Sequence, residues 1–190
     1  MTGSFEVVGQ TRIADTGFVA IDRVAVRADG ETYDRTVVRH PGAVVVVPVV
    51  ADGVVLMVRQ FRAATGGALL EVPAGKRDQE GEPPERTAVR ELEEEIGHRP
   101  GRLVKLAEFW NSPGFCDEYS HVFVALDLEM VGDGTGAPTS PEERAMTTER
   151  VALADIEALV SSRRLVDAKS IIGLLLARQH LAGAHEPLDP

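Results

Sequence analysis

Residues 75–97 have the sequence GKRDQEGEPPERTAVRELEEEIG, and the second half of this stretch predicts a helix. The prolines at 83–84 suit the first turn of a helix, where a missing N–H costs nothing, and Gly97 suits its end. Apolar residues recur every fourth position, at Ala88, Leu92 and Ile96. This period gives the helix one apolar face, which we expect to pack against a sheet.

Glu91 and Glu95 lie one turn apart at the edge of that apolar face, with Glu94 near Glu91 and Glu93 pointing elsewhere. A run of glutamates is often no more than a solvated acidic surface. Two penalties disfavour that interpretation here: like charges at i,i+4 cost about 0.2–0.5 kcal/mol, and acidic residues near a helix C-terminus oppose the macrodipole. A divalent cation would remove both. Because the donors are all carboxylate oxygens, the pattern favours Mg²⁺ or Mn²⁺ over zinc.

Composition limits the classes of partner that the chain can have. Its 190 residues carry a formal net charge of −10, which disfavours nucleic acid and anionic membrane as partners, since both require a basic surface. The longest apolar run, 43–50, is too short to span a bilayer. The single cysteine, Cys116, excludes an intrachain disulfide, and the N-terminus lacks the regions of a signal peptide, so we expect a cytoplasmic protein.

Short apolar segments separated by turn residues predict a mixed α/β (α+β) fold. The expected strands are 5–9, 18–26, 33–39, 43–49, 54–61, 68–72, 103–110, 119–128 and 151–153, with a hairpin turn at 28–30. Further helices are expected at 154–162 and 167–181, and a long loop at 131–148. The segment 43–49 is apolar throughout, which predicts a strand buried on both faces. We expect an N-terminal strand subdomain at 1–40, a main domain at 41–182 and a flexible tail at 183–190.

The pattern Arg90-Glu91-Leu92-x-Glu94-Glu95-x-Gly97, preceded by Glu82 and a loop from Gly75, resembles the Nudix box of the nucleoside-diphosphate-X hydrolases. The chain departs from the family pattern at two places. The loop between Gly75 and Glu82 is one residue longer than usual, and His98 replaces an aliphatic residue. The resemblance implies a Nudix α/β/α sandwich with a mixed central sheet, together with a small N-terminal antiparallel β-sheet.

Features outside the box resemble the ADP-ribose pyrophosphatase branch of that family. Pro113 lies fifteen residues beyond His98, a spacing typical of the branch, although by itself it also suits a plain turn. Gln60-Phe61-Arg62 followed by Leu70-Glu71-Val72-Pro73-Ala74-Gly75 is similar to the strand pair that precedes the box. The N-terminal strands resemble those that such enzymes exchange to form a homodimer.

The resemblance also implies which residues would hold a metal. The ligands would be Glu91 and Glu95, with Glu94 assisting, and the carbonyl of Ala74. Glu82 is either an outer metal or structural ligand, or the residue that caps the helix N-terminus. Arg90 would pair with nearby carboxylates and hold them in place. A bound Mg²⁺ or Mn²⁺ would neutralise charge on a pyrophosphate and lower the pKa of a bound water.

The general base of this branch usually comes from a late loop, which makes Glu142 the first candidate and Glu143 the second. A pair of glutamates in a loop is otherwise solvated surface. Arg62 is expected to contact the pyrophosphate, because a guanidinium matches phosphate oxygens in pairs. The other implied substrate contacts are Arg35, donated across the dimer, Phe18, which either stacks on adenine or belongs to the core, and Pro113, Gly114 and Glu118 in a stretch similar to the substrate loop.

These expectations combine into a metal-dependent hydrolase that converts ADP-ribose to AMP and ribose 5-phosphate. A first alternative is a pyrophosphatase for another nucleotide sugar or a dinucleotide, which the same box would serve. A second is a regulator that binds ADP-ribose without cleaving it. The retained glutamates and the acidic charge disfavour the regulator, since such proteins usually combine a lost glutamate with a DNA-binding domain.

Overall fold

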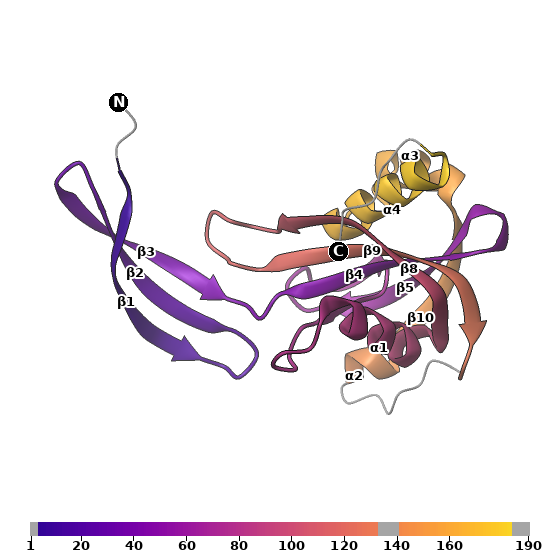
Figure 1. Cartoon of the computed structure of the whole chain (residues 1–190), viewed down its shortest axis with the longest axis horizontal. Coiled ribbons are helices and arrows are strands. Elements are labelled where there is room, and N and C mark those ends of the chain that lie inside the picture. Colours follow the sequence, from indigo (N-terminus) through magenta and orange to yellow (C-terminus); the bar gives the residue numbers. More distant parts are fainter. Residues whose placement is uncertain (1–3, 133–140, 184–190) are drawn as a thin grey trace. The chain divides into compact units, whose positions relative to one another are not determined.

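In the computed structural model, which describes residues 4–132 and 141–183, the strands form two separate sheets (Figure 1). The three-stranded sheet holds β1 (Glu6–Asp15), β2 (Ala20–Ala28) and β3 (Glu31–Arg39). The seven-stranded sheet holds β4 (Ala43–Val50), β5 (Val54–Arg62), β6 (Gly67–Glu71), β7 (Ala74–Lys76), β8 (His98–Trp110), β9 (Tyr119–Met130) and β10 (Thr147–Ala152). The helices are α1 (Pro84–Ile96), α2 (Pro141–Arg144), α3 (Ile156–Ser161) and α4 (Ala168–Leu181), with single 3₁₀ turns η1 (Ala51–Gly53) and η2 (Leu153–Asp155).

The contacts divide the chain into two units, each of which we describe by itself. The first comprises the chain up to Gly42 together with Phe109–Tyr119, and the second comprises Ala43–Glu108 and the chain from Ser120 onward. The sequence predicted a boundary at residue 40, which would assign the segment Phe109–Tyr119 to the main domain at 41–182. In the structure Val38 donates a backbone hydrogen bond to Phe115 and accepts one from Asp117, so this segment joins β3.

The first unit is an antiparallel meander of β1, β2 and β3. The hairpin turn between β2 and β3 lies where it was expected, because Asp29 and Gly30 both have positive φ, at 51° and 84°. The first strand is longer than the expected 5–9, because β1 pairs with β2 from Glu6 to Asp15, with register shifts that interrupt but do not end the pairing. Asp22, on β2, is buried and accepts hydrogen bonds from Gln10, Arg12 and Arg39.

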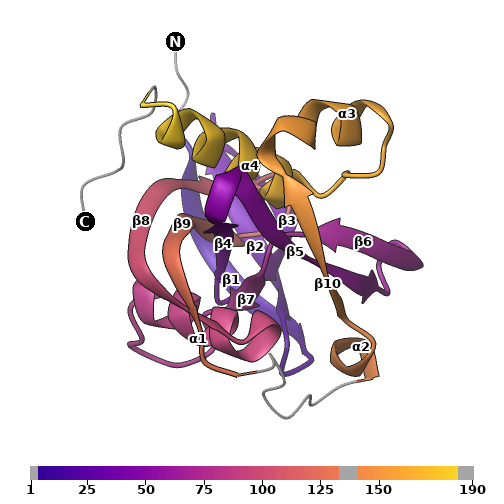
Figure 2. The same cartoon turned by 90° about the vertical axis from the view of Figure 1, so that its right-hand side faces the viewer.

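The second unit is a mixed sheet with helices on both faces, and this confirms the expected sandwich (Figure 2). Strand β4 pairs in parallel with β9 and antiparallel with β5 and β7. Val44, Val45, Val46 and Val47 are all fully buried, which confirms that this strand has no exposed face. Val44 and Val46 pack in the core cluster beneath α1, whereas Val45 and Val47 lie next to Gly173 of α4. Among the described residues, no helix is both long enough and apolar enough to cross a membrane.

Local signals set both ends of α1, as the sequence predicted. Pro83 is its N-cap and Pro84 its first residue, and Gly97 ends it in the left-handed conformation at φ 67°. The N–H of Gly97 donates to the carbonyls of Leu92 and Glu93. Asp167 caps α4 as predicted and accepts a hydrogen bond from the N–H of Ser170.

Other boundaries differ from the expected ones. Strand β8 begins at His98 rather than at residue 103. The expected helix at 154–162 is a 3₁₀ turn followed by α3. Part of the expected loop at 131–148 is structured, because α2 occupies Pro141–Arg144. Strand β10 starts at Thr147, which pairs with Arg59 of the antiparallel strand β5. Residues 133–140 of that loop and 184–190 of the expected tail lie outside the described residues.

Candidate active site

The site is built around the edge of α1 that faces β7. Leu92 is fully buried, and Ala88 and Ile96 pack with it against the sheet, so the helix cannot rotate freely. This orientation brings Glu91 against Gly75. A Cβ atom on Gly75 would lie only 1.9 Å from Cδ of Glu91, so only glycine allows the carboxylate to lie against this backbone. One turn later, Oε2 of Glu95 accepts a 3.3 Å hydrogen bond from the N–H of Ala74.

Burial makes the ionised form of both carboxylates unfavourable. The pKa of Glu91 is raised to about 7, first by burial and further by the charge of Glu94, against the opposing effect of Arg90. The pKa of Glu95 is raised to about 8 by burial and by the neighbouring charge of Glu91. A divalent cation between such oxygens would reverse both effects, because it favours the ionised carboxylates.

Arg90 supplies positive charge to the acidic cluster. Its Nη1 lies 2.8 Å from Glu91 and 3.1 Å from Glu94, and its Nη2 lies 3.6 Å from Asp78 and 3.7 Å from Glu82. Glu94 is half-exposed, whereas Glu91 is 12% exposed, so Glu91 has lost more of its hydration. The predicted pairing of Arg90 with nearby carboxylates is therefore present.

The donor set fits a hard cation, although it is not arranged as a closed cage. Over residues 4–132 and 141–183, no three His, Cys, Asp or Glu side chains converge closely enough to hold a metal by themselves. The oxygen donors at hand are Glu91 and Glu95, with Ala74 directly beside them in β7. Gly75 lets the Glu91 carboxylate lie against β7. This group contains no sulfur or imidazole donor, which suits Mg²⁺ or Mn²⁺, because these ions bind substrate phosphates and water besides one or two carboxylates.

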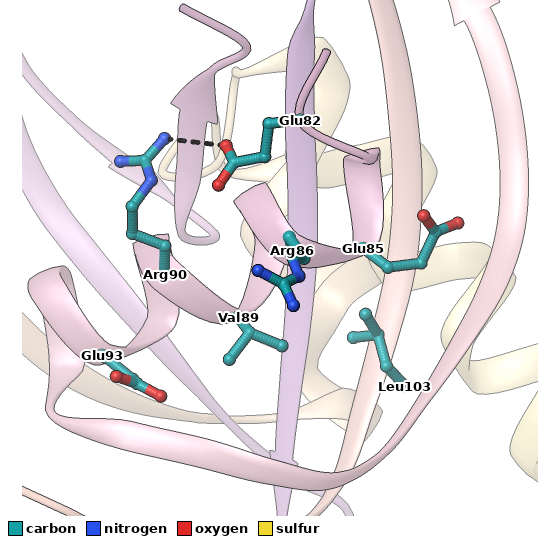
Figure 3. Close-up of a pocket in the computed structure, with 7 residues that line it drawn as sticks. All are labelled: Glu82, Glu85, Arg86, Val89, Arg90, Glu93 and Leu103. Carbon is teal, nitrogen blue, oxygen red and sulfur yellow. Dashed lines mark ion pairs between the residues drawn. The ribbon is translucent and has the colours of Figure 1, made fainter. Parts of the chain in front are cut away.

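Glu82 does not cap the helix, so that alternative is wrong. Pro83 occupies the N-cap position, and no side chain makes a cap hydrogen bond there. The carboxylate of Glu82 instead accepts a 2.8 Å hydrogen bond from the Thr87 hydroxyl and lies near Arg90 (Figure 3). Glu82 therefore ties the loop before α1 to the first turn of the helix.

The longer loop before α1 has a second anchor, which involves residues that the sequence did not indicate. Nη1 of Arg77 lies 3.3 Å from Nε2 of His121, and Nδ1 of His121 lies 2.7 Å from Glu108, which also pairs with Lys105. Since Arg77 can only donate, His121 accepts at Nε2 and donates from Nδ1. Burial lowers the pKa of His121, which favours this neutral form.

Arg62 is held by Glu71, a residue to which the sequence analysis gave no role. Nε and Nη2 of Arg62 each donate a 2.8 Å hydrogen bond to one oxygen of the Glu71 carboxylate. Glu71 follows Leu69 and Leu70 at the end of β6 and is almost completely buried. A single charged residue in an apolar strand is a signal for a buried ion pair, and it could have identified Glu71.

A pocket of about 510 Å³ lies beside α1, but it is not the carboxylate site (Figure 3). It is lined by Glu82, Glu85, Arg86, Val89, Arg90, Glu93 and Leu103. Neither Glu91 nor Glu95 lines it, because both point from another side of the helix.

The remaining predicted substrate residues belong to the first unit. Phe18 is 58% exposed with its ring edge-on to His40, so its assignment to the core is wrong; it lies in the turn between β1 and β2. The guanidinium of the exposed residue Arg35 lies 4.3 Å above the ring of Tyr33. Pro113, Gly114 and Glu118 lie in the segment between β8 and β9, where the Glu118 carbonyl accepts a hydrogen bond from Asn111.

The two candidates for the general base lie on α2 of the second unit. Glu142 is partly buried, and α2 packs against β5. Glu143 is its neighbour in the same helical turn, and its side chain lies outside the described part of the chain.

The sequence of this chain matches a family model and several known proteins. The model of the NUDIX domain family matches residues 38–169. An ADP-ribose pyrophosphatase from Bacillus subtilis (strain 168) is 42% identical over 142 residues, which cover 75% of this chain and 75% of that protein. An ADP-ribose pyrophosphatase from Mycobacterium tuberculosis (strain ATCC 25618 / H37Rv) is 34% identical over 185 residues, which cover 96% of this chain and 87% of that protein.

The fold is also shared with a solved structure. The crystal structure of an ADP compounds hydrolase superposes with a TM-score of 0.78 and covers 95% of both chains, at 24% identity. At this identity the likeness concerns the fold alone. The family match, in contrast, spans most of the chain and includes the whole of α1 with its glutamates. The chain therefore belongs to the Nudix hydrolase family.

Proposed function

We propose that the protein hydrolyses the pyrophosphate bond of ADP-ribose to give AMP and ribose 5-phosphate, and that it requires Mg²⁺ or Mn²⁺. The observation that carries the proposal is the placement of Glu91 and Glu95 against β7, with pKa values of about 7 and 8. Two largely buried carboxylates one helical turn apart are costly unless a cation accompanies them. The choice of substrate is supported by the two relatives that are named ADP-ribose pyrophosphatase.

Each candidate site residue on α1 and next to it has its own task in this proposal. Glu91, Glu95 and the Ala74 carbonyl would hold the cation, with Glu94 assisting and Glu82 as an outer ligand. When bound, the cation supplies positive charge for the pyrophosphate and activates water for attack on phosphorus. Arg90 keeps Glu91 and Glu94 in place.

Contacts to the substrate and the proton transfer complete the proposal. Arg62 would bind the pyrophosphate through the guanidinium nitrogen that does not contact Glu71. Glu142, or else Glu143, would accept the proton of the attacking water, because carboxylates that hold a cation are poor bases. The other candidate substrate contacts are Phe18, which would stack on adenine, Arg35, which would be donated across a homodimer, and Pro113, Gly114 and Glu118.

A substrate panel tests the proposal directly. The purified protein is incubated with ADP-ribose, GDP-mannose, UDP-glucose, NAD and diadenosine polyphosphates, with Mg²⁺, with Mn²⁺ and with excess EDTA, and the products are separated by ion-exchange chromatography. We expect the highest kcat/KM for ADP-ribose, AMP and ribose 5-phosphate as products, and no turnover in EDTA. Turnover that persists in EDTA would contradict the metal requirement. A higher kcat/KM for another nucleotide sugar would show that this compound is the substrate, and the proposed type of reaction would still hold.

A further inference from the structure

Glu71 is a buried carboxylate close to the metal-binding face of α1. It pairs with Val58 across the antiparallel strands β5 and β6, and directly opposed residues in such a pair point to the same face of a sheet. Val58 belongs to the core cluster beneath α1. Glu71 therefore faces α1, and its charge contributes to the raised pKa of Glu95.

The pairing with Arg62 fixes the plane of a guanidinium group. Two parallel N–H···O bonds of 2.8 Å join Nε and Nη2 of Arg62 to the two oxygens of Glu71. The Glu71 side chain is 2% exposed and that of Arg62 is 38% exposed, so the carboxylate forms the buried end of the pair. The edge of the guanidinium that includes Nη1 takes no part in the pair and can bind two oxygens of another anion.

The first turn of α4 holds the backbone next to Glu71. The buried N–H of Val72 donates a 2.9 Å hydrogen bond to Oγ of Ser170. The Ser170 hydroxyl in turn donates a 2.7 Å hydrogen bond to Asp167, the N-cap of α4. Glu71 is thus a fixed support, while Arg62 has the longer and more exposed side chain. The bidentate pair with Glu71 therefore restricts the Arg62 guanidinium to one orientation.

We propose that Glu71 is a positioning residue, which holds the Arg62 guanidinium so that its open edge binds the pyrophosphate of a nucleoside diphosphate substrate. This inference rests on the proposed function, because it assigns to the substrate the anion that Arg62 binds. It predicts that, at saturating Mg²⁺, Glu71 influences substrate binding only through Arg62.

A double-mutant cycle tests this prediction. Glu71→Gln is made in the wild type and in Arg62→Gln, a background that keeps an amide donor for residue 71 but lacks the guanidinium fork. We expect Glu71→Gln to lower kcat/KM for ADP-ribose by about tenfold, mainly through KM, and to change it less than about twofold in Arg62→Gln. The control is Glu149→Gln, which breaks the half-exposed pair of Glu149 with Arg59, also on β5, and should leave kcat/KM within about twofold.

Binding of the α,β-methylene analogue of ADP-ribose, measured by calorimetry, separates the inference from the proposed function. If the wild type binds this analogue without hydrolysing ADP-ribose, the proposed reaction is wrong. The double-mutant cycle is then completed with dissociation constants of the analogue in place of kcat/KM. Suppose instead that the wild type hydrolyses ADP-ribose and that Glu71→Gln lowers kcat/KM by the same factor in the Arg62→Gln background as in the wild type. Glu71 then has only a structural role. A wild type that neither binds nor hydrolyses overturns both proposals. Should Glu71→Gln fail to fold, Glu71→Asp replaces it with a smaller expected loss, which must again vanish in Arg62→Gln.

Discussion

At the scale of single residues, Gly75 decides where the carboxylate of Glu91 lies. An added Cβ would meet Cδ, Oε1 and Cγ of Glu91 at 1.9, 2.2 and 2.3 Å. These atoms form the end of a flexible side chain, so the backbone can keep its course while the carboxylate moves away. The substitution therefore removes a ligand position without removing the fold.

We predict that Gly75→Ala lowers metal affinity and kcat by roughly 10–100-fold, the range seen when groups that orient a metal ligand are lost. The melting temperature should change little, because only the Glu91 side chain must move. Gly67→Ala is the matched control, since a Cβ there has no atom within 4 Å. Kinetics under Mg²⁺ titration, together with thermal unfolding, check both statements; a normal activation constant in Gly75→Ala would contradict the first.

The raised pKa values of Glu91 and Glu95 predict how stability depends on pH. Both lie above the ordinary value of 4.5, so the folded, metal-free protein binds more protons than the unfolded chain up to about pH 8. This stabilisation is fully present below about pH 4.5, declines as the pH rises from there through 7, and is lost above about pH 8. His121 has a lowered pKa and acts in the opposite direction, but only below its ordinary value of 6.5.

In EDTA, we therefore expect the melting temperature of the wild type to fall between about pH 6.5 and about pH 8, and excess Mg²⁺ to abolish most of this slope. Glu95→Gln should flatten the slope and melt higher than the wild type at pH 8, because it lacks the buried charge. It should also lower kcat by orders of magnitude. A wild-type slope that persists unchanged in Glu95→Gln would show that another group titrates. Normal turnover in this variant would exclude Glu95 as a metal ligand.

Among the secondary-structure elements, α4 is joined by a buried hydrogen bond to Val72, the residue that follows β6. Oγ of Ser170 accepts from the N–H of Val72, and Ser170 is fully buried. Removing the hydroxyl leaves a buried N–H without an acceptor, which costs about 1–3 kcal/mol.

Ser170→Ala should accordingly lower the free energy of unfolding by about 1–3 kcal/mol, with an unchanged m-value in urea. Ser162→Ala serves as the control, because the Ser162 hydroxyl bonds to the Ala158 carbonyl at the exposed end of α3. We expect the control to lie within about 0.5 kcal/mol of the wild type. Equal losses in the two variants would show that burial of the Val72 N–H is not the cause.

The general base is a prediction about α2. Glu142→Gln should lower kcat strongly with little change in KM or metal affinity, since the proton transfer matters mainly in the transition state. Glu143→Gln should have a milder effect. A larger loss in Glu143→Gln than in Glu142→Gln would assign the base to Glu143. Near-normal turnover in both variants would exclude α2 as the source of the base.

In the molecule as a whole, the first unit exposes apolar residues on β1 and next to its strands, and a monomer would leave them in water. Phe5, Val7, Ile13 and Phe18 are 71%, 64%, 51% and 58% exposed. An isolated small sheet is marginally stable in water, and an exposed strand can pair with a second copy. These features support a homodimer built through the N-terminal strands.

Light scattering at micromolar concentration should give about twice the chain mass of 20.4 kDa. Ile13→Lys should shift the mass toward one chain and lower activity, because it places a charge on the exposed face of β1. Met130→Lys, at a residue that is 76% exposed in the second unit, should leave the dimer intact. A wild type that is monomeric and fully active would contradict the dimer and the cross-dimer role of Arg35.

Elements whose ends and faces are set by near neighbours in the chain could be predicted from the residues alone. Pro84 and Gly97 bound α1 because capping is local, and the spacing of Glu91 and Glu95 follows from the helical period. The valines at 44–47 predicted a strand buried on both faces, because no polar residue interrupts them. The family resemblance followed from the same local pattern.

Contacts between residues far apart in the chain could not be predicted in this way, because they depend on how the elements pack. The pair of Glu71 with Arg62 depends on the hairpin register of β5 and β6, and the contact of Glu91 with Gly75 depends on how α1 packs on β7. The pKa values of the carboxylates depend on burial, which no local pattern contains. Phe18 is exposed for the same reason, since an aromatic residue in a turn is buried only if another element covers it. Local periodicity sets the direction of a side chain, and long-range packing sets what it faces.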